Sequence, residues 1–359
     1  MTSPASDSMI GQLRRASKPP EEPQRSRRTK MFPDFIGIGA QKAGTTWLHR
    51  NLQAHPQIFM PRKEIHYFDR KIRDHSNPVN RFFGKRDIDN QWRGQVKSAS
   101  VQLMKKPSFQ DLRWNFNYYM RSYNDSWYAS VFEPKDGKAA GEITPAYSVL
   151  DRERVAYVHS LVPDVKIIFF MRNPIERAWS QTVMSFDKVE KGSVKSVSEK
   201  QLFRQLGRNS TWKLSDYLRT FENWGSFYPE ERFFVGFLED VHFFPEELLR
   251  RLYDFLGVDP SFEPPLREKK IHTRSIGTMP TKVATHLAEN FREEITRLQE
   301  RFGGYASFWL HCADRLISDP PSEAHLPYPL WETPLWDEWE GSREITMSSG
   351  PLSSVRAPS

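Results

Sequence analysis

The sequence predicts an α/β fold, a single domain with a central parallel sheet flanked by helices, and three apolar runs carry this prediction. The runs are FPDFIGIGA at residues 32–40, VKIIFFM at residues 165–171 and FFVGFL at residues 233–238. Strands that are buried on both faces of a parallel sheet have such nearly continuous apolar sequences. Each run is followed by a segment with helical features, and alternation of strands and helices favours parallel pairing through right-handed crossovers.

The helices that follow these runs are predicted from their spacing and their ends. Residues 47–52 have helical spacing after a glycine-containing loop. After the second run, Asn173 is a suitable N-cap and Pro174 suits the first helical position. After the third run, PEELLRRLYDFL is amphipathic and Gly257 is placed to end it. A long helix at residues 281–302 completes the domain.

Composition divides the 359 residues into a domain at residues 31–318 and two flanking segments. Residues 1–30 are rich in Ser, Pro and Arg and have seven basic and three acidic residues, so we expect a disordered basic tail. Residues 319–359 form an acidic extension with a net charge of −5 that contains Trp331, Trp336 and Trp339. We expect this extension to fold back over the domain, with a partner-docking role as the alternative.

Charge and cysteine content restrict the class of protein. Residues 31–318 carry a net charge of +8, which suits an anionic small ligand, and the absence of a recognisable groove-reading module argues against nucleic acid. The single cysteine, Cys312, excludes an internal disulfide and a cysteine-based zinc cluster, which fits a reducing compartment. No stretch approaches the ~20 apolar residues of a membrane span, and we expect a cytoplasmic protein. The oligomeric state is not predicted.

The loop after the first run has the composition of a phosphate site. The stretch GAQKAGTT at residues 39–46 resembles the P-loop pattern G-x-x-x-x-G-K-[ST], except that Lys42 precedes the second glycine by two residues. Gly39 and Gly44 permit the backbone to curl around a phosphate, and Thr45 and Thr46 add hydroxyl donors at the start of a helix. The sequence therefore predicts a P-loop-like nucleotide-binding core, with a ligand-free strand-to-helix turn as the alternative.

A second anion site is predicted after the second run. Arg172 follows the strand directly, and Ser180 lies about two helical turns further on. The planar guanidinium suits a phosphate, and the hydroxyl adds a donor. Two loops at the carboxyl ends of neighbouring strands would hold a nucleotide with two separate phosphates. The alternative is a surface arginine and an ordinary helix serine.

A small-molecule kinase is the main alternative function. A kinase or ATPase of this fold normally has an acidic residue at a strand end that holds magnesium. Only Glu239 and Asp240, after the third run, offer such groups, and the usual P-loop lysine is missing. A non-catalytic nucleotide-binding protein is a further alternative.

Four motifs in order carry a resemblance to a known family. GAQKAGTTWL, PRKEIHYFD, GEITPAY and MRNPIERAWSQ resemble the sulfotransferases that use 3′-phosphoadenosine 5′-phosphosulfate, most closely the bacterial and heparan sulfate types. The similarity extends from about residue 32 to about residue 302. It implies metal-independent transfer of a sulfuryl group to a hydroxyl or amine of a carbohydrate or other small-molecule acceptor.

The resemblance also implies roles for individual residues. The first loop would hold the 5′-phosphate and place the displaced lysine beside the bond that breaks, and the second loop would hold the 3′-phosphate. A later loop at residues 267–280 would close over the 3′-phosphate and adenine, with Arg274 as its candidate. The donor-binding residues implied are Lys42, Ala43, Gly44, Thr45, Thr46, Arg172, Ser180 and Arg274.

The general base implied by the resemblance is Glu64, in the motif KEIHYFD. His66 is the alternative, because histidine titrates near neutral pH and residues 64 and 66 face the same side if this segment is extended. We interpret Lys63 and Asp69 as polar residues satisfied by their surroundings.

The sequence departs from the heparan-type pattern at Ile143, where these enzymes commonly have a lysine. The resemblance leaves Lys63, Lys135 and Lys138 as candidates for the missing charge. Aromatic residues are frequent at residues 82–132 and could stack on an acceptor, although Tyr128 and Phe132 have helical spacing and suit the core better. The acceptor itself is not predicted.

Overall fold

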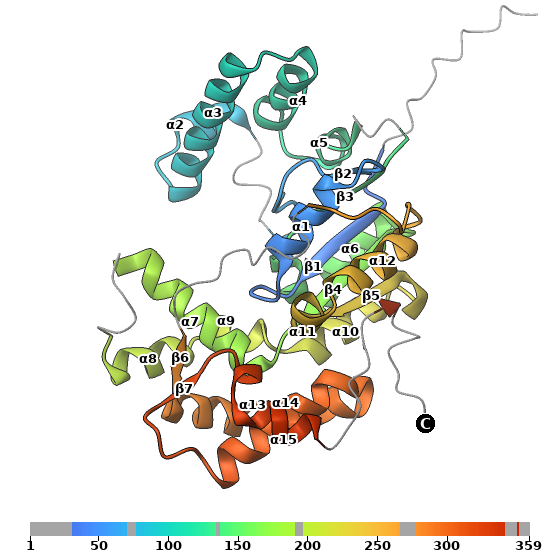
Figure 1. Cartoon of the computed structure of the whole chain (residues 1–359). Coiled ribbons are helices and arrows are strands. Elements are labelled where there is room, and N and C mark those ends of the chain that lie inside the picture. The colour runs from blue at the N-terminus through green and yellow to red at the C-terminus, as the bar shows by residue number, and fades with distance from the viewer. Residues whose placement is uncertain are drawn as a thin grey trace, which may run out of the picture. The chain divides into compact units, whose positions relative to one another are not determined.

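The computed structural model describes residues 31–69, 77–133, 137–190, 197–265, 277–341 and 350–351 (Figure 1). Its centre is a sheet with the strand order β2-β3-β1-β4-β5-β8, in which the first five strands are parallel and β8 is antiparallel to β5. The strands are β1 (Phe35–Gly39), β2 (Ile58–Phe59), β3 (Ala139–Ile143), β4 (Lys166–Met171), β5 (Phe233–Phe237) and β8 (Gly350–Pro351). The predicted α/β fold with a central parallel sheet is confirmed.

Helices cover both faces of this sheet, as the alternating side chains of its central strands show. Phe169 of β4 packs against Phe221 of helix α10 (Tyr217–Gly225) with ring centroids 5.3 Å apart. On the opposite face, Phe234 of β5 packs against Phe255 of helix α12 (Pro245–Leu256) with ring centroids 5.5 Å apart. Burial on both faces explains why these strands are continuous apolar runs.

The helices of the first part of the chain connect the strands and include a group inserted between β2 and β3. The inserted helices are α2 (Pro78–Phe83), α3 (Asp87–Lys105), α4 (Phe109–Met120) and α5 (Asp125–Ser130). The others are α1 (Thr45–Ala54), α6 (Arg152–Leu161), α7 (Pro174–Glu190), α8 (Glu199–Leu206), α9 (Asn209–Lys213), α10 (Tyr217–Gly225), α11 (Leu238–Phe243) and α12 (Pro245–Leu256).

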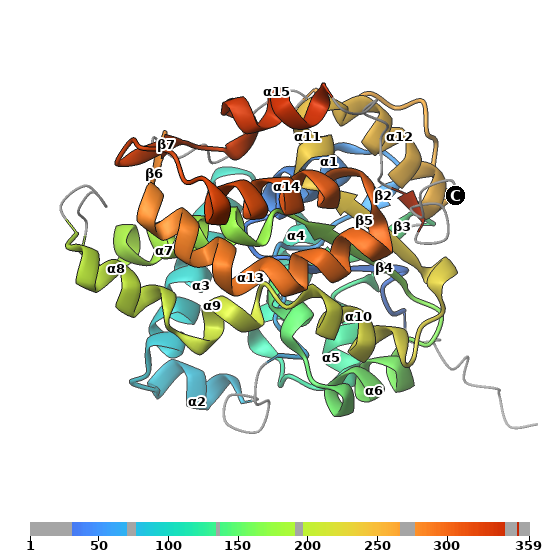
Figure 2. The same cartoon turned by 90° about the horizontal axis from the view of Figure 1, so that it is seen from below.

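The last part of the chain begins with the short strand β6 (Thr278–Pro280), which pairs with β7 (His325–Pro327). Between them, α13 (Thr281–Phe302) and α14 (Gly304–Ser318) run side by side (Figure 2). Helix α15 (Pro334–Glu340) follows, and its Trp336 stacks on Phe243 of α11 with ring centroids 4.8 Å apart. The described part of the acidic extension up to residue 341 therefore packs against the domain through Trp336.

Several predicted element boundaries are confirmed. Helix α13 has the predicted bounds, α12 ends at Gly257 in a left-handed conformation, and the Asn173 side chain accepts a hydrogen bond from the Ile175 N–H at the start of α7. Among the described residues, no helix is both long and apolar enough to cross a membrane.

Candidate active site

The loop between β1 and α1 has the backbone of an anion site. Lys42 and Gly44 have left-handed φ angles of 76° and 84°. Helix α1 begins at Thr45 without a side-chain hydrogen bond at its N-cap and without an acidic residue in its first turn. The first N–H groups of a helix lack partners within the helix, so this end of α1 can bind a phosphate. The Ala43 N–H is engaged within the loop, where it donates to the Ala40 carbonyl (3.2 Å).

Glu64, His66 and Asp69 form a row in the loop after β2. The His66 Nδ1 atom lies 2.7 Å from Asp69 Oδ2, and its Nε2 atom lies 3.6 Å from Glu64 Oε2. The segment is not extended, since Glu64 and His66 have left-handed φ angles of 61° and 58°. The two side chains lie together nevertheless, and the Glu64 N–H donates to the Ile143 carbonyl of β3 (3.0 Å), which ties the loop to the sheet.

Electrostatics keep Glu64 charged. The hydrogen bond from His66 lowers the pKa of Glu64 to about 2, with the positive charge of Lys63 acting in the same direction against partial burial. The Glu64 side chain is also the more accessible, at 42% exposure against 24% for His66. The carboxylate can therefore meet a molecule from solvent, whereas His66 has a carboxylate on each side.

Lys63 connects this row to the loop between β1 and α1 and the first two residues of α1, residues 40–46, which are called the phosphate loop from here on. Its Nζ atom donates to Thr46 Oγ1 at 2.5 Å and lies 3.3 Å from Glu64 Oε1. Of the two described candidates for the charge missing at Ile143, Lys63 and Lys138, Lys63 is the one that contacts both the phosphate loop and Glu64. Ile143 itself is fully buried, and a Cβ added at Gly37 would lie 2.7 Å from its Cγ1 atom, so this position is filled by sheet packing.

Arg172 is buried beside the phosphate loop and already has three partners. Its Nη1 donates to the Lys42 carbonyl (3.3 Å), and its Nε lies 3.5 Å from Glu176 Oε2. Its Nη2 donates to the Tyr328 hydroxyl at 2.5 Å, and the Ser180 side chain lies near the same hydroxyl. The structure thus brings Arg172 and Ser180 close to one oxygen atom. No sequence pattern pointed to Tyr328, which lies 156 residues after Arg172.

The motif GEITPAY supplies a buried carboxyl beneath the site. Glu142 accepts hydrogen bonds from the hydroxyls of Tyr128 (2.6 Å), Thr144 (2.7 Å) and Tyr147 (3.2 Å). Burial raises the pKa of Glu142 to about 7. The Tyr147 hydroxyl also accepts from the Tyr67 N–H (2.9 Å), so this network supports the loop that carries Glu64. Tyr128 lies in the core, as its spacing predicted.

The acidic pair considered for a kinase lies in the protein core. Glu239 and Asp240 are fully buried, and Glu239 Oε1 accepts from Trp309 Nε1 (2.6 Å). Burial raises the pKa of each to about 8. Protonated carboxyls within the core are unsuited to hold magnesium.

Arg274 and Lys135 lie outside the described residues, so their predicted roles remain predictions.

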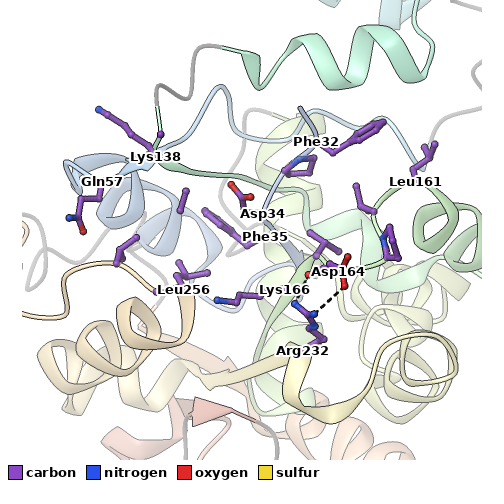
Figure 3. Close-up of a pocket in the computed structure, with 18 residues that line it drawn as sticks. Phe32, Asp34, Phe35, Gln57, Lys138, Leu161, Asp164, Lys166, Arg232 and Leu256 are labelled. Atoms are coloured by element: carbon purple, nitrogen blue, oxygen red, sulfur yellow. Dashed lines mark hydrogen bonds and ion pairs between the residues drawn. The ribbon is translucent and has the colours of Figure 1, made fainter. Parts of the chain in front are cut away.

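A pocket of about 730 Å³ lies at the opposite edge of the sheet, at the amino ends of β1, β3 and β4 (Figure 3). Lys138, Lys166 and Arg232 are among its lining residues. Lys166 donates to the Phe255 carbonyl (2.6 Å) and Arg232 pairs with Asp164 (3.2 Å). Among the described residues, none of those predicted to bind the donor lines this pocket, and ligands of open α/β sheets bind at the carboxyl ends of the strands.

The parallel sheet, the glycine-containing loop between its strand β1 and helix α1, and the basic side chains around this loop define an α/β protein with a P-loop-like core. Residues 33–264 match the sulfotransferase family, and the chain belongs to this family.

Known sulfotransferases are similar to this chain at low sequence identity. Heparan sulfate glucosamine 3-O-sulfotransferase 6 of Homo sapiens is 24% identical over 234 residues, which cover 64% of this chain and 53% of the relative. Carbohydrate sulfotransferase 15 of Mus musculus is 23% identical over 330 residues, with 79% and 55% covered. The match thus spans about half the length of these relatives. A sulfotransferase from Alicyclobacillus acidocaldarius aligns in structure with a TM-score of 0.49 and 24% identity over 74% of this chain and 94% of that chain.

Proposed function

We propose that this protein transfers a sulfuryl group from 3′-phosphoadenosine 5′-phosphosulfate to a hydroxyl or amine of a carbohydrate or other small-molecule acceptor. The observation that carries the proposal is the Lys63 bridge. This one ammonium contacts Thr46 of the phosphate loop at 2.5 Å and Glu64 at 3.3 Å. A phosphate-binding group and a carboxylate base are therefore adjacent, as a single transfer step requires.

The donor would be held at two points. The uncapped start of α1, with the Thr45 and Thr46 hydroxyls, suits the 5′-phosphate. Arg172 and Ser180, which converge on one oxygen atom in the free protein, suit the 3′-phosphate. Lys42, at the crest of the loop, and Lys63 would lie near the oxygen that bridges phosphorus and sulfur.

Glu64 would act as the general base. The acceptor oxygen or nitrogen forms a bond to sulfur, the bond between sulfur and the 5′-phosphate oxygen breaks, and that oxygen keeps the electron pair. Glu64 takes the acceptor's proton, and Lys42 and Lys63 stabilise the charge that develops on the leaving phosphate. A bound donor adds negative charge near Lys63 and Glu64, which raises the pKa of Glu64 above its low value in the free protein and makes it a better base.

His66 would be a positioning residue. With Asp69 at Nδ1 and Glu64 near Nε2, its ring fixes the Glu64 side chain, so neither nitrogen is directed at an acceptor. This geometry favours Glu64 over His66 as the base, and it keeps the charged form of Glu64 in place.

The inserted helices α2–α4 would contact the acceptor. Arg62, two residues before Glu64, donates to the Tyr119 hydroxyl of α4 (2.6 Å) and lies over the Tyr118 ring, so this group is attached next to the base. Its exposed large apolar side chains are Val79, Phe82, Phe83, Val101, Met104, Phe109, Leu112, Phe116 and Met120. Exposed aromatic faces of this kind can stack on a sugar ring or another apolar acceptor surface.

The test uses the full chain with the donor and a metabolite extract, read by mass spectrometry for an added sulfuryl group. We expect sulfated products with the wild type and with Glu247→Gln, an exposed control in α12, but none with Glu64→Gln. Glu64→Gln should bind adenosine 3′,5′-bisphosphate with nearly unchanged affinity, because the base does not hold the phosphates.

Calorimetry separates the alternatives. Binding of adenosine 3′,5′-bisphosphate that is independent of magnesium supports the proposal, whereas binding of ATP only with magnesium would support a kinase. Donor binding without any sulfated product across the extract would support a non-catalytic protein. Normal turnover by Glu64→Gln would contradict the role of Glu64.

A further inference from the structure

Tyr328 lies in the segment between β7 and α15, beyond the part of the chain that matches the family. Its hydroxyl accepts a hydrogen bond from Arg172 Nη2 and lies near Ser180, and the Arg172 guanidinium lies 5.1 Å from the centre of its ring. These are the two residues expected to hold the 3′-phosphate of the donor. An oxygen of this protein therefore already occupies the position where a phosphate oxygen is expected.

A phosphate oxygen that takes the position of the Tyr328 hydroxyl at Arg172 Nη2 has to displace that hydroxyl. Arg172 Nη1 donates to the Lys42 carbonyl, and the guanidinium also pairs with the Glu176 carboxylate. Of the two neutral partners, the Tyr328 hydroxyl is on a half-buried side chain that can rotate, whereas the Lys42 carbonyl belongs to the loop backbone. A phosphate forms stronger, charge-assisted hydrogen bonds to a guanidinium than a neutral hydroxyl does. The hydroxyl is thus the partner that an anion displaces most easily.

The backbone on both sides of Tyr328 is held in place. The Tyr328 N–H donates to the Gly277 carbonyl (3.0 Å), and the Leu330 N–H donates to Glu176 Oε1 (2.6 Å). Release of the hydroxyl therefore requires rotation of the side chain and leaves the segment anchored.

We propose that the Tyr328 hydroxyl occupies the 3′-phosphate site in the free protein, leaves it when the donor binds, and returns when the product dissociates. This inference rests on the proposed function, because it assumes that Arg172 and Ser180 bind that phosphate. The product, adenosine 3′,5′-bisphosphate, keeps the 3′-phosphate, so a competing hydroxyl weakens product binding and speeds release. Product release limits turnover in many enzymes.

The test compares Tyr328→Phe with the wild type by calorimetry. In the free variant, Arg172 Nη2 has lost its hydroxyl partner. The 3′-phosphate of the bisphosphate can therefore bind Arg172 without first displacing that hydroxyl. We expect Tyr328→Phe to bind adenosine 3′,5′-bisphosphate about tenfold more tightly, equivalent to about 1.4 kcal/mol, and to bind AMP, which has no 3′-phosphate, with unchanged affinity. Unchanged or weaker binding of the bisphosphate would overturn the proposal. It would indicate that Tyr328 itself binds the phosphate or has a purely structural role.

Tyr228→Phe is the matched control. Tyr228 is buried and lies far in sequence from both Arg172 and Ser180, and its hydroxyl donates to the Val162 carbonyl (3.1 Å). This control should bind both nucleotides like the wild type. A wild-type protein that binds neither nucleotide would instead refute the proposed function, so the two failures are distinguishable.

A second measurement follows the side chain itself. Fluorine NMR of the protein labelled with 3-fluorotyrosine identifies the Tyr328 signal as the one missing from Tyr328→Phe. We expect the bisphosphate, but not AMP, to shift this signal in the wild type. A signal that does not respond to the bisphosphate while calorimetry shows binding would overturn displacement of the hydroxyl.

Discussion

Replacing Lys63 with methionine removes one positive charge and keeps a side chain of similar length. The folded protein should lose little stability. Lys63 and Glu64 are 29% and 42% exposed, and exposed ion pairs contribute about 0–1 kcal/mol. The cost should instead appear in the transition state, where the developing charge on the leaving phosphate loses a fixed cation. Loss of one such group typically lowers kcat by about 10²–10³, or about 2.7–4 kcal/mol.

The variant should also change the pH dependence of turnover. Lys63 is one of the groups that lower the pKa of Glu64, so its removal raises that pKa, although the hydrogen bond from His66, the larger cause, remains. Protonation inactivates a carboxylate base, so turnover of Lys63→Met should decline at a higher pH than turnover of the wild type as the solution is made acidic.

The assay measures kcat and KM for the donor across pH, with urea unfolding as the stability measurement. Lys138→Met is the matched control, because Lys138 lines the pocket at the opposite edge of the sheet. We expect the control to behave as wild type. Turnover of Lys63→Met within about threefold of the wild type would refute the bridging role, since even one weak contact to a charged group is worth more than that. A comparable loss in Lys138→Met would show that the charge missing at Ile143 is supplied from elsewhere.

Two further predictions concern the core. Burial raises the pKa of Glu239 to about 8 from its ordinary 4.5, so its stabilising effect is complete below about pH 4.5 and is lost as pH rises toward 8. Glu239→Gln should therefore match the wild type in urea unfolding at about pH 5 and exceed it at about pH 8, with a gap that grows by at most about 1.4 kcal/mol per pH unit; a gap independent of pH would contradict this. An added Cβ at Gly141 would lie 2.3 Å from the Phe35 ring, so Gly141→Ala should lose about 1–3 kcal/mol, whereas Gly94→Ala, in an open position of α3, should gain about 0.5–1 kcal/mol. Equal stability of the two alanine variants in urea would show that the ring moves without cost.

The strands predicted from sequence are those whose composition is set by their own burial. Strands β1, β4 and β5 lie in the middle of the sheet, and their apolar runs follow from cover on both faces. Strand β3 was missed because Glu142 interrupts its apolar pattern. That carboxyl is tolerated in the core because three hydroxyls satisfy it, and one of them belongs to Tyr128 of α5, 14 residues earlier, which a local pattern does not show.

In the candidate site, too, local features were predictable from the sequence and contacts between distant residues were not. The order and spacing of residues in the phosphate loop were sufficient to predict a glycine-containing turn between a strand and a helix that starts at about Thr45, because that geometry is local. The closeness of Glu64 and His66 was anticipated from an extended segment, but two left-handed residues produce it instead. The Lys63 bridge to Thr46 and the contact of Tyr328 with Arg172 join residues 17 and 156 positions apart, and no local pattern encodes them.

The anchoring of Glu176 has a practical consequence for how the protein is cloned. The match to the family stops at residue 264, yet Glu176 depends on the Leu330 N–H, and Phe237 at the end of β5 packs against Trp309 with ring centroids 5.5 Å apart. An expression fragment trimmed to the family boundary would expose an aromatic surface and leave a buried carboxylate without its backbone partner. Fragments meant for crystallisation or assay should therefore extend at least to the end of α15 at Glu340.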